Sequence, residues 1–598
     1  MQVDDAVQRE PVDQPRAPIA SNVRLALVAA GLALVVVHVW IASRLPDKGP
    51  FVLGDEGGYL GNATYLVHRY GHPVDGYFGG YSLFLVPAAL LRSAPHAYYE
   101  TALYTNALLS FATATLAFLL ARELFPRLRV SGAALVAAAV VLEPYVFVGT
   151  HLAMSENALV PASLLTAWLL ARQLERPTIA TGVLGGLAAS FAFWISPRGT
   201  LLVVAFAIVH LLAWLRRQER FPLVAATGAA TALSMGVGFV FNRALRGHSK
   251  VPGVDSATEI PSLTKASTWR DLIAGTGGRL DAFGFATAGL AVVGLVATVV
   301  WIRRVRAGAN AKGPGAPTPA QLTVGLFASL AVLLTVLSTA LTMSHTRLDG
   351  LYYARYAEGI GMPLVVVGSA WMLSWSAADR PRLAAARVAL GAGAVMIGGA
   401  LCVRLFPKPA PIYTEAAVNV LGVFAVRDVF GLDGYKQPLL VGAILATAAL
   451  ALAVVDARLA LVAVLVLSVG AASTIHSDFL LPSSRLRRGN EKVARLVTRL
   501  GAVGIGAHCI SYEGAAAGGW PLRNEVFLLP KWRFHEAKAP RYRRCGALDL
   551  TIGSKPRSAG DWRRVGDEGF FVPSTLWIDM ASVPASTRDR VAALLPAG

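Results

Sequence analysis

Charged residues are scarce in this chain of 598 residues: Asp, Glu, Lys and Arg together make up 15% of the sequence. Soluble globular proteins carry about a quarter. Hydrophobic residues make up 55%, and the mean hydropathy is +0.53. This balance excludes a string of ordinary soluble domains, which the length alone would suggest. It indicates a chain dominated by one membrane-embedded bundle.

Cysteine is also rare, with three in the whole chain, and no CxxC or Cys/His cluster has the spacing of a zinc site. Cys402 lies in an apolar run, where we expect it to act as a small inert hydrophobic residue. Cys509 and Cys545 follow the last apolar run. If that tail faces an oxidising compartment, the two can form a disulfide.

Acidic residues are outnumbered by basic ones, which gives a net charge of +19 and a pI of about 10.1. In a soluble protein this excess would raise the question of nucleic-acid binding. Here most of it lies in short connections between apolar runs, as the positive-inside rule describes. We therefore expect no nucleic-acid partner, and expect a lipid bilayer or an anionic lipid substrate instead.

Apolar runs long enough to cross a bilayer recur along most of the chain. Residues 1–22 are polar and proline-containing, and we expect a disordered cytoplasmic tail there. The first run, Leu25 to Ala42, has no small-residue cleavage pattern near its end and is interpreted as a retained span. About 13 spans are predicted, at 24–43, 99–121, 131–149, 156–171, 178–195, 200–215, 222–242, 283–302, 321–342, 359–376, 386–403, 438–455 and 458–474.

Lys and Arg gather in every second connection between these runs. By the positive-inside rule those connections are cytoplasmic, which places the N-terminus inside and the tail outside. The connections predicted to face outward are long, and long loops in compact proteins are usually functional. The chemistry is therefore predicted at the outer membrane–water boundary. The long outer connections are 44–98, 243–282 and 404–437.

The predicted fold is an all-α polytopic membrane bundle over residues 23–475, with a small extracytoplasmic α/β domain over 476–598. The apolar segment 81–92 is too short to span the bilayer and fits a half-buried interfacial helix. In the tail, alternating apolar stretches predict strands, and other segments have a helical pattern. The strand stretches are 503–510, 525–529 and 547–552, and the helical segments are 490–500 and 586–595.

Two adjacent carboxylates, Asp55 and Glu56, stand just beyond the first span in the sequence Gly-Asp-Glu-Gly-Gly-Tyr. Carboxylates at a membrane surface are costly to desolvate and therefore suggest a function. The flanking glycines allow the backbone to pass close to a ligand. An exposed acidic turn in a glycine-rich loop would have the same composition.

The pattern Asp-Glu-x-x-Tyr in the first outer loop of a many-span bundle resembles the GT-C superfamily of membrane glycosyltransferases, which use lipid-linked sugars. The branch it resembles contains the protein O-mannosyltransferases and the lipid A aminoarabinose transferases. The resemblance covers roughly residues 24–475, and the tail matches no family. The residues that carry it are Asp55, Glu56 and Tyr59, then Tyr77 and Tyr81 in Tyr-Phe-Gly-Gly-Tyr, and the pair Arg355-Tyr356.

The resemblance implies an inverting transfer from a polyprenyl-phosphate sugar to a glycan, glycolipid or protein of the bacterial cell envelope. Asp55 would be the general base that takes the proton of the acceptor hydroxyl. Glu56 would orient the acceptor or help to bind a metal. Some superfamily members use a divalent cation and others in the same branch do not. The spacing of His68, His72 and His345 matches no metal motif, so the cofactor stays open.

The departing lipid phosphate needs a fixed cation, and an Arg side chain offers a two-pronged donor for it. The outer-face candidates are Arg198, Arg347 and Arg355, and Tyr356 with its aromatic neighbours is placed to flank the isoprenoid or the sugar. The same sequence pattern would arise from an interfacial belt of Tyr residues with Arg side chains that reach toward water.

A further cluster, at residues 151–157, opens the fourth predicted span. His151, Ser155, Glu156 and Asn157 are candidate substrate-binding residues there. The alternative is that Ser155 caps the helix and Glu156 complements its N-terminal dipole. Glu143 is expected nearby, as a partner for His151 or for an outer Arg.

Two other classes of function compete with an enzyme. A transporter or flippase of a lipid-linked substrate would show inverted repeats and polar sites at mid-membrane. Here the polar residues gather at the outer ends of the spans, which favours an interfacial enzyme. A non-catalytic scaffold for envelope assembly would not need the Asp55–Glu56 pair. Four Trp and many Arg in the tail suit either acceptor binding or the core of a small domain.

Overall fold

The computed structural model describes most of the transmembrane region and the regular elements of the tail. The described residues are 21–45, 49, 53–68, 73, 76–91, 95–216, 218–248, 264–307, 317–343, 351, 353–374, 381–405, 421–486, 488–505, 508–513, 529, 532–537, 545–552, 555–556, 560–568 and 574–595. The predicted disordered tail lies almost wholly outside them, and so does Arg347.

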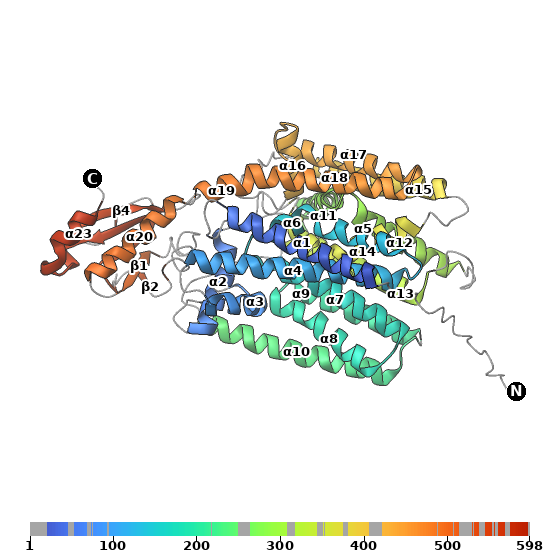
Figure 1. Ribbon diagram of the computed structural model, residues 1–598, viewed down its shortest axis with the longest axis horizontal. Helices are drawn as coiled ribbons and strands as arrows, with labels where there is room; N and C mark the ends of the chain where they lie inside the picture. Colours follow the sequence, from blue (N-terminus) through green and yellow to red (C-terminus); the bar gives the residue numbers. More distant parts are fainter. Residues whose placement is uncertain are drawn as a thin grey trace.

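Helices make up most of the described chain (Figure 1). Those of the bundle are α1 Ser21–Arg44, α2 Leu53–His68, α3 Gly79–Leu91, α4 Pro95–Leu124, α5 Val130–Val141, α6 Pro144–Gly149, α7 Glu156–Glu175, α8 Ile179–Ile195, α9 Gly199–Leu215, α10 Phe221–Gly247, α11 Ala266–Ala286, α12 Leu290–Arg306, α13 Pro319–Met343, α14 Arg355–Ser374, α15 Pro381–Val403, α16 Leu421–Val429, α17 Lys436–Ala451, η3 Leu452–Val454, α18 Ala457–Ile475, η4 His476–Leu480 and α19 Leu481–Leu486.

By length and composition, eight helices in the described residues can cross a membrane. The bent pair α11 and α12 makes a ninth if it counts as one span, and α3, α5, α8 and α9 are shorter apolar helices. The chain is therefore a multi-pass membrane protein built on a helical bundle, as predicted. The predicted count of 13 is not confirmed. The eight are α1, α4, α10, α13, α14, α15, α17 with η3, and α18 continued to Ser484.

Two of the predicted spans are broken. The span predicted at 131–149 divides into α5 and α6 because Pro144 lacks an N–H group and forces Glu143 out of the helical region, to φ −55° and ψ 132°. The span predicted at 283–302 begins inside α11. The chain bends by 110° after it, through Ala288 and Gly289, which both have positive φ.

The first predicted outer loop, 44–98, contains the two short helices α2 and α3. They lie at the end of the bundle from which α19 leads into the C-terminal domain (Figure 1). Helix α3 closely matches the predicted interfacial helix. Gly80 lets it approach α8, because a Cβ there would lie 2.4 Å from the backbone of Trp194. On the outer side of α3, Leu90 and Leu91 are exposed, as an interfacial position requires.

The C-terminal domain is a five-stranded sheet with helices, which confirms the predicted α/β character. The strand order is β2-β1-β3-β5-β4, in which β1 runs parallel to β2 and β3, and β5 runs antiparallel to β3 and β4. The pattern located β3 and both main helices. The strand predicted at 503–510 overlaps only the start of β1, the strand predicted at 525–529 lies almost wholly outside the described residues, and β2, β4 and β5 were not predicted. The elements are α20 Arg488–Val503, β1 Cys509–Glu513, β2 Arg533–Ala537, β3 Leu548–Ile552, β4 Trp562–Glu568, β5 Ser574–Asp579, η5 Met580–Ser582, η6 Ala585–Thr587 and α23 Arg588–Leu594.

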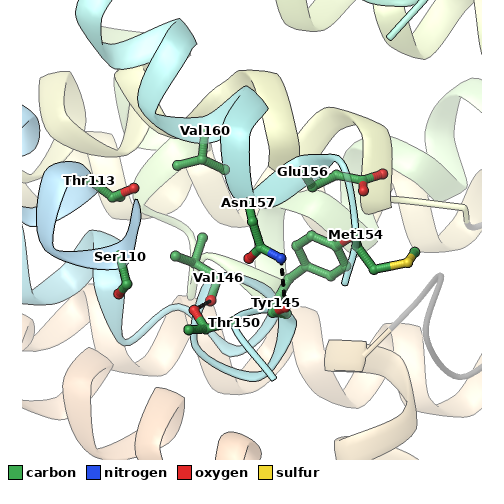
Figure 2. Close-up of a pocket in the computed structure, with 10 residues that line it drawn as sticks. Ser110, Thr113, Tyr145, Val146, Thr150, Met154, Glu156, Asn157 and Val160 are labelled. Carbon is green, nitrogen blue, oxygen red and sulfur yellow. Dashed lines mark hydrogen bonds between the residues drawn. The ribbon is translucent and has the colours of Figure 1, made fainter. Parts of the chain in front are cut away.

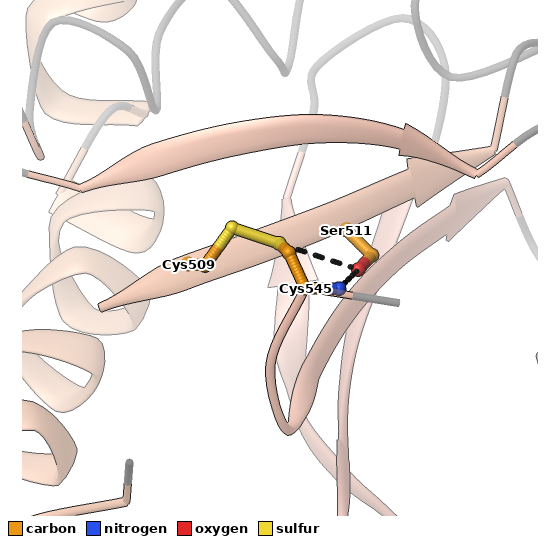
Figure 3. Close-up of a disulfide and its surroundings, with 3 residues drawn as sticks. All are labelled: Cys509, Ser511 and Cys545. Carbon is orange, nitrogen blue, oxygen red and sulfur yellow. Dashed lines mark hydrogen bonds between the residues drawn. A yellow bond between two sulfur atoms is a disulfide. The ribbon is translucent and has the colours of Figure 1, made fainter. Parts of the chain in front are cut away.

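Each of the two regions has its own hydrophobic core. One extends through the bundle from Ala42 to Leu480, and the other joins α20 and α23 to the sheet, from Val493 to Val591. In the second region, Cys509 and Cys545 form a disulfide, with their Cα atoms 5.8 Å apart, that ties β1 to the segment before β3 (Figure 3). Such a bond persists in oxidising compartments.

Candidate active site

The first turn of α2 carries the adjacent carboxylates Asp55 and Glu56. The positive end of a helix dipole favours negative charge at this place. Successive residues of a helix point about 100° apart, so the two side chains enter different surroundings. The side chain of Asp55 is 31% exposed, whereas Glu56 is fully buried. Of the pair, Asp55 is therefore the one that an incoming molecule can reach.

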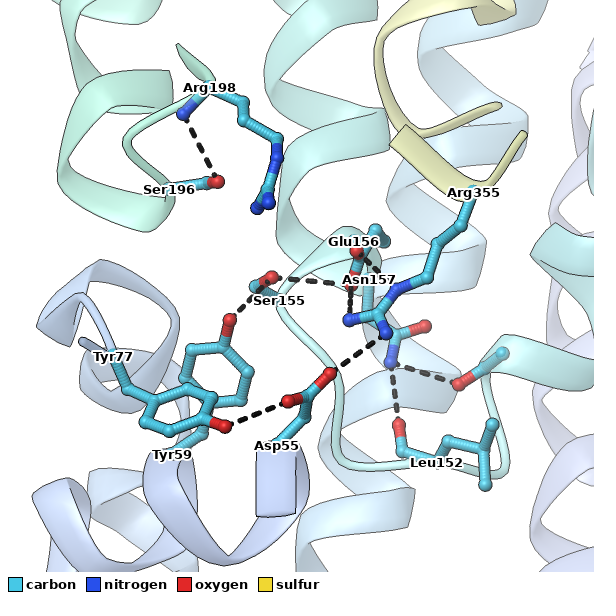
Figure 4. Close-up of polar contacts among 11 residues, drawn as sticks. Asp55, Tyr59, Tyr77, Leu152, Ser155, Glu156, Asn157, Ser196, Arg198 and Arg355 are labelled. Carbon is cyan, nitrogen blue, oxygen red and sulfur yellow. Dashed lines mark hydrogen bonds and ion pairs between the residues drawn. The ribbon is translucent and has the colours of Figure 1, made fainter. Parts of the chain in front are cut away.

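Two donors hold the Asp55 carboxylate (Figure 4). The guanidinium Nη1 of Arg355, at the start of α14, lies 2.8 Å from Oδ2. The hydroxyl of Tyr77, which precedes α3, donates to Oδ1 at 2.8 Å. Each donor occupies a different oxygen. These two contacts fix the orientation of the carboxylate.

Arg355 also binds a second carboxylate, Glu156, in the first turn of α7. Its Nε lies 2.6 Å from Oε1 and its Nη2 lies 3.2 Å from Oε2, which makes a two-pronged pair. Gly359 allows this approach, since a Cβ there would come within 3.2 Å of the Glu156 side chain. Arg355 is buried, and its guanidinium bridges two carboxylates contributed by α2 and α7.

Tyr59 extends the cluster from the next turn of α2. Its hydroxyl donates to Oγ of Ser155 at 2.8 Å, and Ser155 donates in turn to Oε2 of Glu156 at 3.2 Å. Burial, with added repulsion from the Glu156 and Asp55 carboxylates, raises the pKa of Tyr59 well above its ordinary value. Ser155 occupies the N-cap position of α7, but its side chain makes no capping hydrogen bond, whereas Glu156 lies in the first turn as the alternative predicted.

Glu56 faces the protein interior. Its Oε1 accepts hydrogen bonds from the Tyr99 hydroxyl at 2.5 Å and from the backbone N–H of Ala153 at 2.7 Å. These contacts tie α2 to α4 and to the connection between α6 and α7. The geometry therefore gives Glu56 a positioning role, and its predicted contact with the acceptor or a metal stays a prediction.

The connection between α6 and α7 is held by further buried amides. Tyr81 donates to Asn106 at 2.8 Å, and the Asn106 amide donates to the carbonyl of Leu152 at 2.9 Å. The Asn157 amide donates to the same carbonyl at 2.7 Å and to that of Gly149 at 3.0 Å. Tyr81 and Asn157, both predicted to bind substrate, thus support the segment that carries Ser155.

His151 turns away from the Asp55 cluster. Its Nε2 lies 3.3 Å from Nδ1 of His38 in α1, and His38 contacts Ser110 on its other side. Burial lowers the pKa of His151, and the neighbouring His38 adds to the effect. Glu143 does not pair with His151 or with an Arg: one of its oxygens accepts the N–H of Val146, and the other has no partner among the described residues.

Arg198, just before α9, is a cation beside the cluster. Its guanidinium carbon lies 3.2 Å from the centre of the Tyr356 ring, and within the described part of the chain no carboxylate pairs with it. Figure 4 shows this side chain pointing toward the space above Tyr59 and Ser155. Arg198 and Arg355 are the two predicted phosphate-binding arginines within the described residues. Arg355 is paired with carboxylates there, and Arg198 is not.

A small cavity of about 10 Å³, with room for about one water molecule, lies beside Glu156 (Figure 2). Its polar lining includes Ser110, Thr150, Asn157 and the ring of Tyr145, whose hydroxyl has no partner among the described residues. Two supporting residues, Tyr99 and Asn106, were not predicted from the sequence, because they are recognisable only through their contacts with Glu56 and with the carbonyl of Leu152.

No group of three or more His, Cys, Asp or Glu that would hold a metal ion occurs in the described residues. His68, one of the histidines considered for a metal, bonds the carbonyl of Ala89. His72 and His345 lie outside the described residues.

No protein-family model matches the sequence, and no curated protein matches it. Among solved structures, ArnT from Cupriavidus metallidurans in the apo state aligns with a TM-score of 0.54 and 13% identity, over 96% of this chain and 99% of that chain. The same protein bound to undecaprenyl phosphate aligns with a TM-score of 0.52 and 13% identity, over 97% and 100%. A weaker similarity, with a TM-score of 0.41 and 14% identity, covers 80% of this chain and 44% of the arabinosyltransferase EmbB from Mycobacterium smegmatis. The chain therefore has the fold of ArnT, which confirms the predicted resemblance at the level of the fold.

Proposed function

We propose that this protein is a glycosyltransferase that moves a sugar from a polyprenyl-phosphate donor to a cell-envelope acceptor, at the outer face of a bacterial plasma membrane. The carrying observation is the cluster of Asp55, Arg355 and Glu156 with the uncommitted cation Arg198 beside it. The ArnT fold supports the enzyme class. The undecaprenyl phosphate bound in one ArnT structure supports the class of lipid.

Asp55 acts as the general base of a direct displacement. The acceptor hydroxyl approaches the exposed edge of the Asp55 carboxylate, whose orientation Arg355 and Tyr77 maintain. As the acceptor oxygen bonds to the anomeric carbon, its proton passes to Asp55. The bond from that carbon to the phosphate oxygen breaks, and the electron pair leaves with the lipid phosphate. The configuration at the anomeric carbon is therefore inverted.

Arg198 holds the lipid phosphate in this proposal. The sequence favours Arg355 for this role, but in the structure each of its three guanidinium nitrogens is hydrogen-bonded to Asp55 or Glu156. Those two carboxylates and one guanidinium already leave an excess of negative charge. An incoming phosphate therefore requires a further cation, and Arg198, stacked on Tyr356, supplies it.

The test supplies the purified protein with polyprenyl-phosphate mannose, arabinose, galactose or glucose and with envelope glycan, glycolipid and protein acceptors. Transfer with inversion, detected by NMR of the product's anomeric proton, is the expected result. Movement of the donor across a vesicle bilayer without transfer would instead identify a transporter. Retention of the anomeric configuration would exclude a mechanism of one direct displacement.

A further inference from the structure

Tyr77 lies where the bundle and the C-terminal domain meet. Among the described residues, its half-buried ring is the one side chain that packs against both hydrophobic cores, that of the helices and that of the sheet domain. It precedes α3, a helix that lies with α2 at the end of the bundle from which α19 leads into the C-terminal domain (Figure 1). A single aromatic ring thus connects two parts of the fold.

The same ring is closely fitted against α2. A Cβ on Gly58 would lie 2.5 Å from two of its ring atoms, and the ring of Tyr59 meets it edge-on with centroids 5.3 Å apart. From this position its hydroxyl donates to Oδ1 of Asp55 at 2.8 Å. Moving the ring therefore removes one of the two donors that orient this carboxylate.

We propose that the C-terminal domain is a positioning element for Asp55 and acts through Tyr77. The docked domain holds the ring of Tyr77, and the hydroxyl of that ring holds the carboxylate. The inference rests on the proposed function only in taking Asp55 as the base. It assigns to the domain a role in the reaction itself, and it assigns to Tyr77 a positioning role in place of the predicted contact with substrate.

Two substitutions of Tyr77 distinguish the contribution of its hydroxyl, which binds Asp55, from that of its ring, which packs against the C-terminal domain. Tyr77→Phe keeps the ring and removes the hydroxyl, so it should lower kcat about tenfold, the effect of losing a hydrogen bond to a charged group, with KM for the donor unchanged. Tyr77→Ala also removes the ring. Coupling is reciprocal, so Tyr77→Ala should in addition raise hydrogen–deuterium exchange in α20 and β1, although neither contains the changed residue.

The matched control is Tyr104 in α4, whose hydroxyl also donates to a carboxylate, Glu100. It packs against the bundle core alone. Tyr104→Phe should leave kcat unchanged, and Tyr104→Ala should leave exchange in α20 and β1 at the level of the unaltered protein. The control shows whether the effects seen at Tyr77 are specific to that position or follow from the loss of any tyrosine–carboxylate hydrogen bond.

A double-mutant cycle tests the direction from domain to site. Replacing Cys509 and Cys545 by Ser loosens the domain and should raise exchange in α2 and lower kcat. In the Tyr77→Phe background the same change should have a much smaller effect on kcat, because the hydroxyl that transmits it is absent. The inference would be overturned if the effects of Tyr77→Phe and of the cysteine replacements on kcat were additive. It would also be overturned if Tyr77→Ala left hydrogen–deuterium exchange in α20 and β1 unchanged. The exchange measurements need no substrate, so absence of transfer in the unaltered protein would reject the proposed function alone.

Discussion

Neighbouring residues of one helix turn acquire different roles because they face different surroundings. Asp55 keeps an exposed edge and two oriented donors, whereas Glu56 is buried and binds the N–H of Ala153. Burial against a hydroxyl and a backbone N–H makes Glu56 a structural acceptor, and partial exposure beside Arg355 makes Asp55 a carboxylate that a hydroxyl can approach. The different surroundings of Asp55 and Glu56 therefore determine which of the two carboxylates an acceptor can reach.

Asp55→Asn should lower the transfer rate by about 10²–10⁴-fold, the usual contribution of a general base. The amide has nearly the same shape but only one acceptor oxygen, so it can accept from Tyr77 or from Arg355 but not from both. Because Arg355 keeps its pair with Glu156, the unfolding temperature in detergent should fall only slightly. The measurements are initial rates and thermal unfolding on the same preparation. Transfer at the unaltered rate would exclude Asp55 as the base.

Arg198→Ala should weaken binding of undecaprenyl phosphate by about tenfold or more, since a charge-assisted hydrogen bond contributes about 1.5–3 kcal/mol. Arg172 provides the matched control: it also stacks on an aromatic ring, that of Trp168, with a separation of 4.9 Å, but it lies in the last turn of α7. Lipid affinity is measured by calorimetry in detergent. If Arg198→Ala and Arg172→Ala bind equally well, the phosphate site lies elsewhere.

Between elements, close helix contacts set the geometry of the site. Helix α14 carries Arg355, and it packs so tightly on α12 that a Cβ on Gly368 would lie 2.1 Å from the carbonyl oxygen of Leu290. On the other face of α14, Gly359 approaches Glu156. Small residues thus allow helix α14 to present its arginine between two carboxylates, as is usual in membrane bundles.

Gly368→Ala should destabilise the bundle by about 1–3 kcal/mol, because the added methyl group meets backbone atoms that cannot move aside. Gly391→Ala on α15 is the control, since nothing lies within 4 Å of a Cβ there. Both changes gain the same helix propensity, so their difference reports the clash. Thermal unfolding in detergent measures it. Equal unfolding temperatures would show that α12 and α14 are packed less closely than described.

For the whole molecule, the disulfide and the charge pattern point to the same orientation. The basic connections predict an inside N-terminus, and the bond between Cys509 and Cys545 requires an oxidising surrounding for the C-terminal domain. The two arguments are independent, because one uses the loops of the bundle and the other uses the tail.

Cysteine labelling tests this orientation in a Cys402→Ala background. Ala585→Cys places an exposed thiol in the C-terminal domain, and Arg127→Cys places one in a connection predicted to be cytoplasmic. A membrane-impermeant maleimide added to intact cells should modify the first and spare the second until the cells are lysed. The reverse pattern would invert the topology and move the proposed site to the cytoplasmic face.

The sequence by itself determined the membrane bundle, the α/β tail, and the acidic pair in the first outer loop. Hydropathy and local pattern report these directly, because they depend on the composition of contiguous segments. The breaks at Pro144 and Gly289 were missed, since apolar composition continues through both. Only the tertiary structure decided that Arg355 bridges Asp55 and Glu156, and that Tyr77 touches both cores. The contact between Arg355 and Asp55 joins residues 300 positions apart, and packing, unlike composition, is not a property of any one segment.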